Sequence, residues 1–188
     1  MHRRHLTAAG AVLAIAAALP ALAQPAPSWP ALGPDSIVLF RHADAPGTGD
    51  PPQFRLGDCG TQRNLGERGR AQAQELGARF RARGIAIGQV LSSQWCRTRD
   101  TAELAFPGRM QEASAFNSFF GEDVAQSARQ TEAARAVLAA WRGPGVLVVV
   151  THQVNITALT GIFPASGEGI VVRATPAGGL DVVGRLPP

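Results

Sequence analysis

The 188-residue chain lacks several side chains on which large classes of proteins depend. It has no lysine and no tyrosine, so all 18 basic residues are arginines, and these face 14 acidic residues. Neither a run of basic residues nor an alternation of aromatic and basic residues is present, which argues against a nucleic-acid-binding protein. We therefore expect no nucleic acid among its partners.

Cysteine and histidine are also scarce, with two and four copies in the chain. Spacings typical of metal sites, such as C-x-x-C or H-x-x-x-H, are missing, so we expect neither a metal nor another cofactor. Cys59 and Cys96 allow only one intramolecular pair. A disulfide between them would suit an oxidising compartment, and the alternative is two buried thiols.

Long apolar runs are limited to one, close to the N-terminus, at residues 6–19. Arg3 and Arg4 precede it, and residues 21–23 (Ala-Leu-Ala) follow with the small-x-small pattern of a signal cleavage site. The run is too short for a comfortable membrane span and has no stop-transfer flank. We predict a signal peptide over residues 1–23 and export to a bacterial periplasm by the Sec or twin-arginine route. The alternative is an uncut N-terminal membrane anchor.

Cleavage after residue 23 would leave a chain long enough for one well-buried domain. Residues 24–34 are rich in proline and alanine and are expected to form a leader, with the domain over residues 35–188. The formal charge falls from +4 to +2 when Arg3 and Arg4 are removed. No stable membrane span is expected in the mature protein.

Short apolar runs alternate with helical patterns along the domain. This order predicts an α/β fold of three layers, with a mostly parallel sheet between helices on both faces and a closing hairpin at the C-terminus. Asn64 is expected to cap the first helix, with Glu67 completing a capping box. The third helix is expected to bury Val124, Leu138 and the other residues of its apolar side. The expected strands are residues 37–40, 89–92, 146–151, 169–173 and 180–186, with a short one near residue 110, and the expected helices are residues 64–84, 93–106, 122–141 and 155–162.

Basic side chains follow two of the apolar strands. Arg41 and His42 come after residues 37–40, and His152 comes after residues 146–151. In open α/β sheets, ligands bind beyond the carboxyl ends of the strands, so these side chains are placed to meet an anion. The alternative is that they are polar strand ends that simply face water.

A third segment adds a guanidinium group to this set of basic side chains. Residues 92–102 read SSQWCRTRDTA, a strand end followed by a helix start that carries Arg97 in its first turn. A helix N-terminus favours anions, and a guanidinium group binds phosphate through two parallel hydrogen bonds. Two arginines and two histidines without metal ligands therefore predict a phosphate pocket. Residues 45–63, which hold seven prolines and glycines, are expected to form a wall or lid of this pocket.

At these residues the chain resembles the histidine phosphatase superfamily, the phosphoglycerate-mutase-like clan. The family's Arg-His-Gly/Ala tripeptide matches Arg41-His42-Ala43, and its Ser-Ser-x-x-x-Arg-x-x-x-Thr-Ala segment matches residues 92–102. Its second histidine, after a valine-rich strand, matches His152. Residues 65–73 are similar to the family's Leu-x-x-x-Gly-x-x-Gln-Ala stretch. The resemblance runs from residue 37 to about residue 161 and implies a phosphoglycerate-mutase-like fold.

The resemblance also implies a role for each matched residue. His42 would attack phosphorus and form a phosphohistidine that water then hydrolyses. Arg41 and Arg97 would clamp the phosphoryl oxygens, and His152 would donate hydrogen bonds to them as an imidazolium. The surrounding cations would keep the attacking nitrogen of His42 unprotonated.

The proton donor for the leaving alcohol is less sharply defined by the resemblance. The family usually supplies a carboxylate between the second arginine and the second histidine, which makes Glu122 the first candidate, followed by Asp123 and Asp44. Glu122 and Asp123 could instead be only an acidic first helical turn, and some family members have no clear acid and act on phosphohistidine or phosphoramidates. Four aromatic residues could line the pocket or belong to the core: Trp95, Phe116, Phe119 and Phe120.

These observations predict an exported phosphatase that hydrolyses a phosphomonoester through a phosphohistidine on His42. One alternative is a phosphomutase, which a periplasmic address disfavours. The other is a catalytically silent phosphate- or glycan-binding module on the same scaffold. The expected partner is a small phosphorylated substrate, and an envelope phosphosugar is one candidate because exported relatives resemble lipopolysaccharide core heptose phosphatases.

Overall fold

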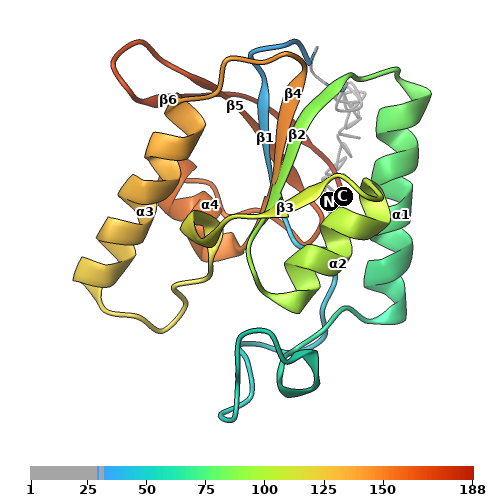
Figure 1. The fold of residues 1–188 in the computed structure, drawn as a ribbon, viewed down its shortest axis with the longest axis vertical. Coiled ribbons are helices and arrows are strands. Elements are labelled where there is room, and N and C mark those ends of the chain that lie inside the picture. Colours follow the sequence, from blue (N-terminus) through green and yellow to red (C-terminus); the bar gives the residue numbers. More distant parts are fainter. Residues whose placement is uncertain (1–28, 30–31) are drawn as a thin grey trace, which may run out of the picture.

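The computed structural model describes residue 29 and residues 32–188 (Figure 1). The signal peptide predicted at residues 1–23 and most of the predicted leader lie outside the described residues, so both stay predictions. Within the part that is described, no helix is long and apolar enough to cross a membrane.

A six-stranded mixed sheet forms the centre of the fold, in the order β3-β2-β4-β1-β5-β6. The first four strands along the chain run parallel, whereas β5 pairs antiparallel with both β1 and β6. The predicted sheet and its closing hairpin are therefore confirmed. The strands are β1 (Ile37–Arg41), β2 (Ile87–Ser92), β3 (Met110–Glu112), β4 (Val146–Thr151), β5 (Gly169–Ala174) and β6 (Leu180–Leu186).

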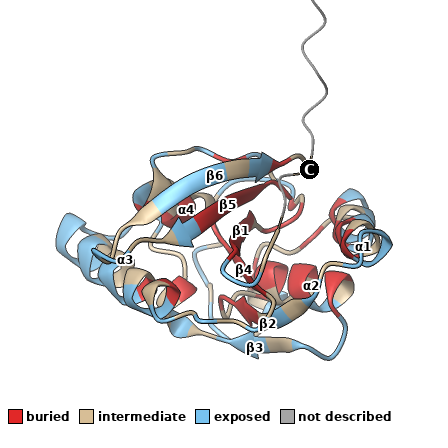
Figure 2. Cartoon of the chain, turned by 90° about the horizontal axis from the view of Figure 1, so that it is seen from above, coloured by how far each residue is buried: buried red, intermediate tan, exposed pale blue. Residues whose placement is uncertain are grey.

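Helices cover both faces of the sheet, which gives the predicted three layers (Figures 1 and 2). On one side lie α1 (Glu67–Ala82) and α2 (Cys96–Ala105), and on the other lie α3 (Val124–Ala139) and α4 (Gln153–Thr160). Two short 3-10 turns, η1 (Cys59–Thr61) and η2 (Ser114–Phe116), complete the list.

The apolar runs of the central strands are continuous because each strand is buried on both faces. In β1, Val38 and Phe40 pack with the core under α1 and α2. Ile37 and Leu39 alternate with them and pack with the core under α3 and α4. Figure 2 shows the buried residues concentrated in the central strands and on the inner sides of the helices.

Two details of the predicted helices are wrong. The first helix begins after Gly66, and Asn64 is not its cap, because the Asn64 side chain instead donates to the Cys59 carbonyl oxygen. A β-carbon at Gly69 would lie 2.0 Å from the Asp44 carbonyl oxygen, so this close approach of α1 to the segment after β1 requires glycine.

The third helix was also expected to bury more of its length. Ala134 and Leu138 are buried, but Val124 is 87% exposed. The first turn of α3 projects beyond the sheet, so its apolar residue has no layer to pack against (Figure 1).

Candidate active site

Three neighbouring strands bring the predicted residues to one edge of the sheet. β1 and β4 pair with Arg41 opposite Thr151, so His42 and His152 each follow the last paired residue of their strand. The Ser93 amide, just after β2, donates to the Val150 carbonyl oxygen at 3.0 Å. The parallel register thus places the ring centroids of His42 and His152 5.7 Å apart.

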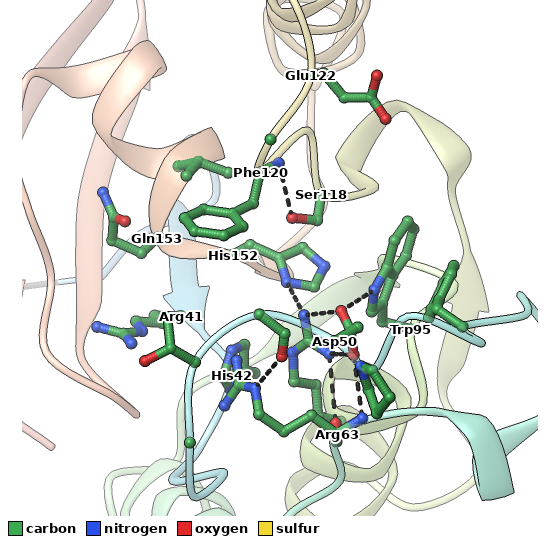
Figure 3. A pocket seen from close by; sticks show the side chains of 18 residues that line it. Arg41, His42, Asp50, Arg63, Trp95, Ser118, Phe120, Glu122, His152 and Gln153 are labelled. Atoms are coloured by element: carbon green, nitrogen blue, oxygen red, sulfur yellow. Dashed lines mark hydrogen bonds and ion pairs between the residues drawn. The ribbon is translucent and has the colours of Figure 1, made fainter.

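The strand ends open into a pocket of about 480 Å³ (Figure 3). All five residues predicted to act in catalysis line it: Arg41, His42, Arg97, Glu122 and His152. His42, Arg97 and His152 form its floor, and each is only 3% exposed. The loop of residues 45–63 contributes one wall, as expected, through residues that include Gly47, Asp50 and Phe54.

His42 is held as a neutral imidazole with one free nitrogen. Its Nδ1 lies 2.7 Å from the Ala43 carbonyl oxygen, which can only accept, so Nδ1 carries the proton and Nε2 keeps its lone pair. Burial is the main reason that the pKa of His42 falls to about 3, and the guanidinium groups of Arg97 and Arg63 act in the same direction. This nitrogen is therefore available as a nucleophile across the physiological pH range.

The main chain next to His42 is tied to α2. The Ala43 amide donates to the Thr101 hydroxyl at 3.0 Å, and that hydroxyl donates to the Arg97 carbonyl oxygen at 2.7 Å. Thr101 thus fixes the position of residue 43 relative to α2, the helix that carries Arg97. The carbonyl oxygen of residue 43 in turn orients the His42 ring.

His152 is also neutral in the resting pocket, whereas the predicted imidazolium concerns a bound phosphoryl group and stays a prediction. Burial, followed by repulsion from Arg97, holds its pKa well below the usual range. Its Nδ1 lies 3.5 Å from Arg97 Nη2, which can only donate, so the proton lies on Nε2, 2.8 Å from the Ser93 hydroxyl oxygen. The Ser93 hydroxyl in turn donates a hydrogen bond to Asn117 Oδ1 at 3.4 Å, and that oxygen also accepts from the Gln94 amide.

The two predicted arginines are placed differently. Arg97, the second residue of α2, faces His152 from the floor of the pocket. Arg41 lines the pocket, but its Nη1 donates to the Pro164 carbonyl oxygen at 3.0 Å, and Figure 3 shows its guanidinium directed away from the histidines. The Nε atoms of both arginines are buried without a partner among the described residues.

Two charged residues of the pocket were not predicted. Arg63 lines it as a third guanidinium, anchored through Nε to the Gly49 carbonyl oxygen at 2.8 Å and through Nη1 to the Ala45 carbonyl oxygen. Asp50 forms a two-pronged ion pair with Arg97, at 2.7 and 3.1 Å. Burial acts to raise the pKa of Asp50, but the hydrogen bonds from Arg97, the Arg63 amide and Trp95 outweigh it and leave the pKa below its ordinary value.

The carboxylates weighed as proton donors lie outside this floor. Glu122 is exposed at the rim, apart from the histidines in Figure 3. Asp123 caps α3 by accepting from the Gln126 amide at 2.8 Å, and neither it nor Asp44 is among the lining residues. Of the three, only Glu122 borders the space that a substrate would fill.

A disulfide joins Cys59 to Cys96, as predicted. It ties the loop of residues 45–63 to the first turn of α2, directly beside Arg97. The Gln62 side chain adds a second link by accepting from the Cys96 amide at 2.9 Å. The loop is therefore a fixed wall rather than a free flap at this end.

The four aromatic residues divide between pocket and core. Trp95 and Phe120 line the pocket, and Trp95 stacks on Phe54 with ring centroids 5.0 Å apart. Phe116 is fully buried under α3, and Phe119 is not among the lining residues. No cluster of three histidine, cysteine or carboxylate side chains suited to a metal ion occurs within the described residues.

Comparison with known proteins agrees with this geometry. Residues 37–119 match the sequence model of the histidine phosphatase superfamily (branch 1), so this part of the chain is similar to that superfamily. The matched segment contains Arg41, His42 and Arg97, whereas His152 lies beyond it. Among curated proteins, none matches the chain.

Several solved structures share the fold. The protein histidine phosphatase SixA complexed with tungstate is 14% identical, with a TM-score of 0.54 over 81% of this chain and 96% of that one. Phosphoserine phosphatase of Entamoeba histolytica in complex with 3-phosphoglyceric acid is 12% identical (TM-score 0.57, 80% and 95%). A mycobacterial glucosyl-3-phosphoglycerate phosphatase is 14% identical (TM-score 0.58, 80% and 97%). At these identities the likeness shows a common fold.

Proposed function

We propose that this chain is a member of the histidine phosphatase superfamily, and that it is an exported phosphatase that hydrolyses a phosphomonoester through a phosphohistidine on His42. The observation that carries the proposal is the state of His42. Its Nδ1 proton is bound by the Ala43 carbonyl, so the unprotonated Nε2 is left for the pocket, beside His152 and Arg97. A neutral, buried and oriented imidazole is what nucleophilic attack on phosphorus requires.

The charge of the pocket matches that of the proposed substrate. Three guanidinium groups line the pocket, those of Arg41, Arg63 and Arg97, and both imidazoles are neutral. The lining carboxylates are Asp50, which is paired with Arg97, and Glu122 at the rim. The charged side chains therefore leave a net positive charge, which favours the binding of a phosphomonoester dianion. α2 and α4 also begin at this edge and add the positive ends of their dipoles.

The reaction proceeds in two displacements. The Nε2 lone pair of His42 forms a bond to phosphorus while the bond to the ester oxygen breaks, and the leaving oxygen takes a proton. Water then attacks the phosphohistidine, which releases inorganic phosphate and restores the neutral imidazole. The guanidinium groups stabilise the negative charge as it spreads over the equatorial oxygens in each step.

His152 must change its protonation to take part. In the resting pocket its Nδ1 accepts from Arg97, so it offers no hydrogen to a phosphoryl oxygen. The approach of a dianion favours the charged imidazole, and proton uptake at Nδ1 would convert His152 into the donor that the family resemblance implies.

Glu122 is the proposed proton donor to the leaving group, because it is the only one of the three weighed carboxylates at the pocket rim. The exposure of Glu122 also favours a second candidate function, a catalytically silent phosphate-binding module. Among the described lining residues, the only carboxylate that contacts the floor is that of Asp50, and it is already paired with Arg97. The leader pattern of residues 1–23 supports export, and the phosphatases that share the fold support a small phosphorylated substrate.

One experiment separates the enzyme from the binding module. The mature chain is incubated with an aryl phosphate such as p-nitrophenyl phosphate, and phosphate release is measured for the wild type and for His42→Ala. We expect release by the wild type and a loss of at least about a thousandfold in the variant. Binding of inorganic phosphate without any turnover would support the silent module.

A further inference from the structure

We infer that Asp50 is a positioning residue. In the resting pocket its carboxylate accepts from both terminal nitrogens of Arg97, the fork of the guanidinium, and so fills the position that an anion would take there. It thereby holds Arg97 in place and weakens the binding of phosphate. The inference rests on the proposed function, because it concerns the same pocket. Its basis is a complete set of contacts around one carboxylate.

All acceptor positions of Asp50 are used within the pocket. Oδ1 accepts from Arg97 Nη1 at 2.7 Å and from the Arg63 amide at 3.1 Å. Oδ2 accepts from Arg97 Nη2 at 3.1 Å and from the Trp95 indole at 2.9 Å. Four donors from three residues would not converge on a carboxylate that only faced solvent, so Asp50 is a built-in ligand of this cluster (Figure 3).

The terminal nitrogens of Arg97 are fully committed as a result. Nη1 donates to Asp50 and to the Arg63 carbonyl oxygen at 3.3 Å, while Nη2 donates to Asp50 and to His152 Nδ1 at 3.5 Å. A guanidinium group has two hydrogens on each terminal nitrogen, so none is spare. The Nε of Arg97 is buried without a partner among the described residues and is open to a phosphoryl oxygen. A phosphoryl group that also contacts Nη2 must take its hydrogen from His152 or displace Asp50.

The two choices have different costs. Taking the hydrogen from His152 leaves Nδ1 free to accept a proton, which suits the proposed reaction. Displacing Asp50 would leave a carboxylate with a side-chain exposure of 16% without its main partner, which is unfavourable. Asp50 thus fixes the plane of the Arg97 guanidinium and leaves one Nη2 hydrogen directed toward His152 Nδ1.

The negative charge of Asp50 has a second effect. Without it, Arg97 would lose the carboxylate that is paired with it, and a dianion would be held more tightly. Repulsion by the carboxylate lowers the affinity for phosphate and favours its release after each turnover.

Asp50→Asn tests the inference because it keeps the shape and removes the charge. We expect inorganic phosphate to bind on the order of tenfold more tightly by calorimetry, while kcat falls at least tenfold because Arg97 loses its fork partner. Asp50→Glu keeps the charge but shifts the fork, so phosphate affinity should stay near that of the wild type while kcat still falls. Asp58→Asn, which removes one exposed carboxylate from the same loop, is the matched control and should change neither quantity.

Loss of the partner of a largely buried ion pair can destabilise the fold, so melting is also measured with and without phosphate. Because phosphate would fill the anion position, the rise in Tm with phosphate should be larger for Asp50→Asn than for the wild type. An equal or smaller rise, or weaker phosphate binding, overturns the inference. A fall in kcat confined to alkyl phosphates, with p-nitrophenyl phosphate unaffected, would identify Asp50 as a proton donor and overturn it as well.

The readouts distinguish this inference from the proposed function. If the wild type shows no turnover but Asp50→Asn binds phosphate more tightly, the role of Asp50 is sustained and the proposed enzyme is refuted. If the wild type shows turnover but the variant binds phosphate no more tightly, the proposed function is sustained and the role of Asp50 is refuted.

Discussion

The floor and the wall of the pocket are built in different ways. The floor consists of strand ends and helix starts, and His42, Arg97 and His152 are each 3% exposed. The wall consists of loops, and two of the residues that line it, Phe120 and Glu122, are exposed. The difference indicates that the charged floor is held by the sheet and the helix starts, whereas the wall is carried by loops, which tolerate sequence changes more readily.

The strongest test of this division changes the floor by one functional group. Arg97→Lys keeps a positive charge but loses the fork that Asp50 and a phosphoryl group both need. We expect kcat/KM for an aryl phosphate to fall about a thousandfold, which corresponds to about 4 kcal/mol of transition-state stabilisation. A loss below tenfold would show that a point charge at this position suffices.

The disulfide tests how far the wall depends on its attachment to the floor. Cys59→Ser with Cys96→Ser removes a cross-link between residues 37 positions apart, which in the chain-entropy model is worth about 4 kcal/mol. We expect the free energy of unfolding in urea to fall by about 2–4 kcal/mol and KM to rise more than kcat falls, because the loop, not the floor, is loosened. An unchanged KM together with a reduced kcat would mean that the bridge acts on Arg97 directly.

The buried histidines predict how the floor responds to acid. A histidine whose pKa is about 3 in the folded chain and about 6.5 in the unfolded chain binds its proton more readily after unfolding. Stability is therefore lost as the pH falls from about 6.5 toward 3, and by pH 4 His42 alone costs about 3 kcal/mol. His42→Gln should lose correspondingly less stability between pH 7 and pH 4 in urea titrations, and parallel pH curves for both proteins would contradict the assignment.

The smallest effect is expected at the wall. Glu122→Gln removes the proposed proton donor, so hydrolysis of an alkyl phosphate should slow by about 10- to 100-fold. Hydrolysis of p-nitrophenyl phosphate, whose leaving group needs no proton, should change less than threefold, roughly the scatter of such comparisons. If Glu122→Gln hydrolyses both substrates at the wild-type rates, the proton donor is another group or water.

The same division explains what could be predicted from the sequence. Apolar strands end at recognisable positions, and a parallel sheet brings those ends together, so the placement of His42 beside His152 follows from the pattern. Arg97 was predictable because it lies in the first turn of a helix that follows such a strand. The fold class follows from the same alternation of strands and helices.

The positions of Asp50 and Arg63 in the pocket could not be predicted because both lie in a long loop. No helical or strand periodicity there fixes the distance between two side chains. Their positions depend on contacts that form only in three dimensions, such as the Cys59–Cys96 bridge and the Gly49 carbonyl that holds Arg63. The one available signal was the density of glycine and proline in residues 45–63, which indicated a wall but not its charged members. The neutral state of His152 in the resting pocket is likewise invisible in the sequence, because it depends on burial of the ring.

The most direct test of the central claim is to trap the intermediate. The protein is mixed with a phosphate-labelled aryl phosphate, quenched in alkali within milliseconds, and digested for mass spectrometry. We expect a phosphoryl group on His42 that survives alkali and is lost in acid, at a level that accounts for turnover. Turnover with no labelled histidine, or with the label on another residue, would contradict the proposal that His42 is the nucleophile.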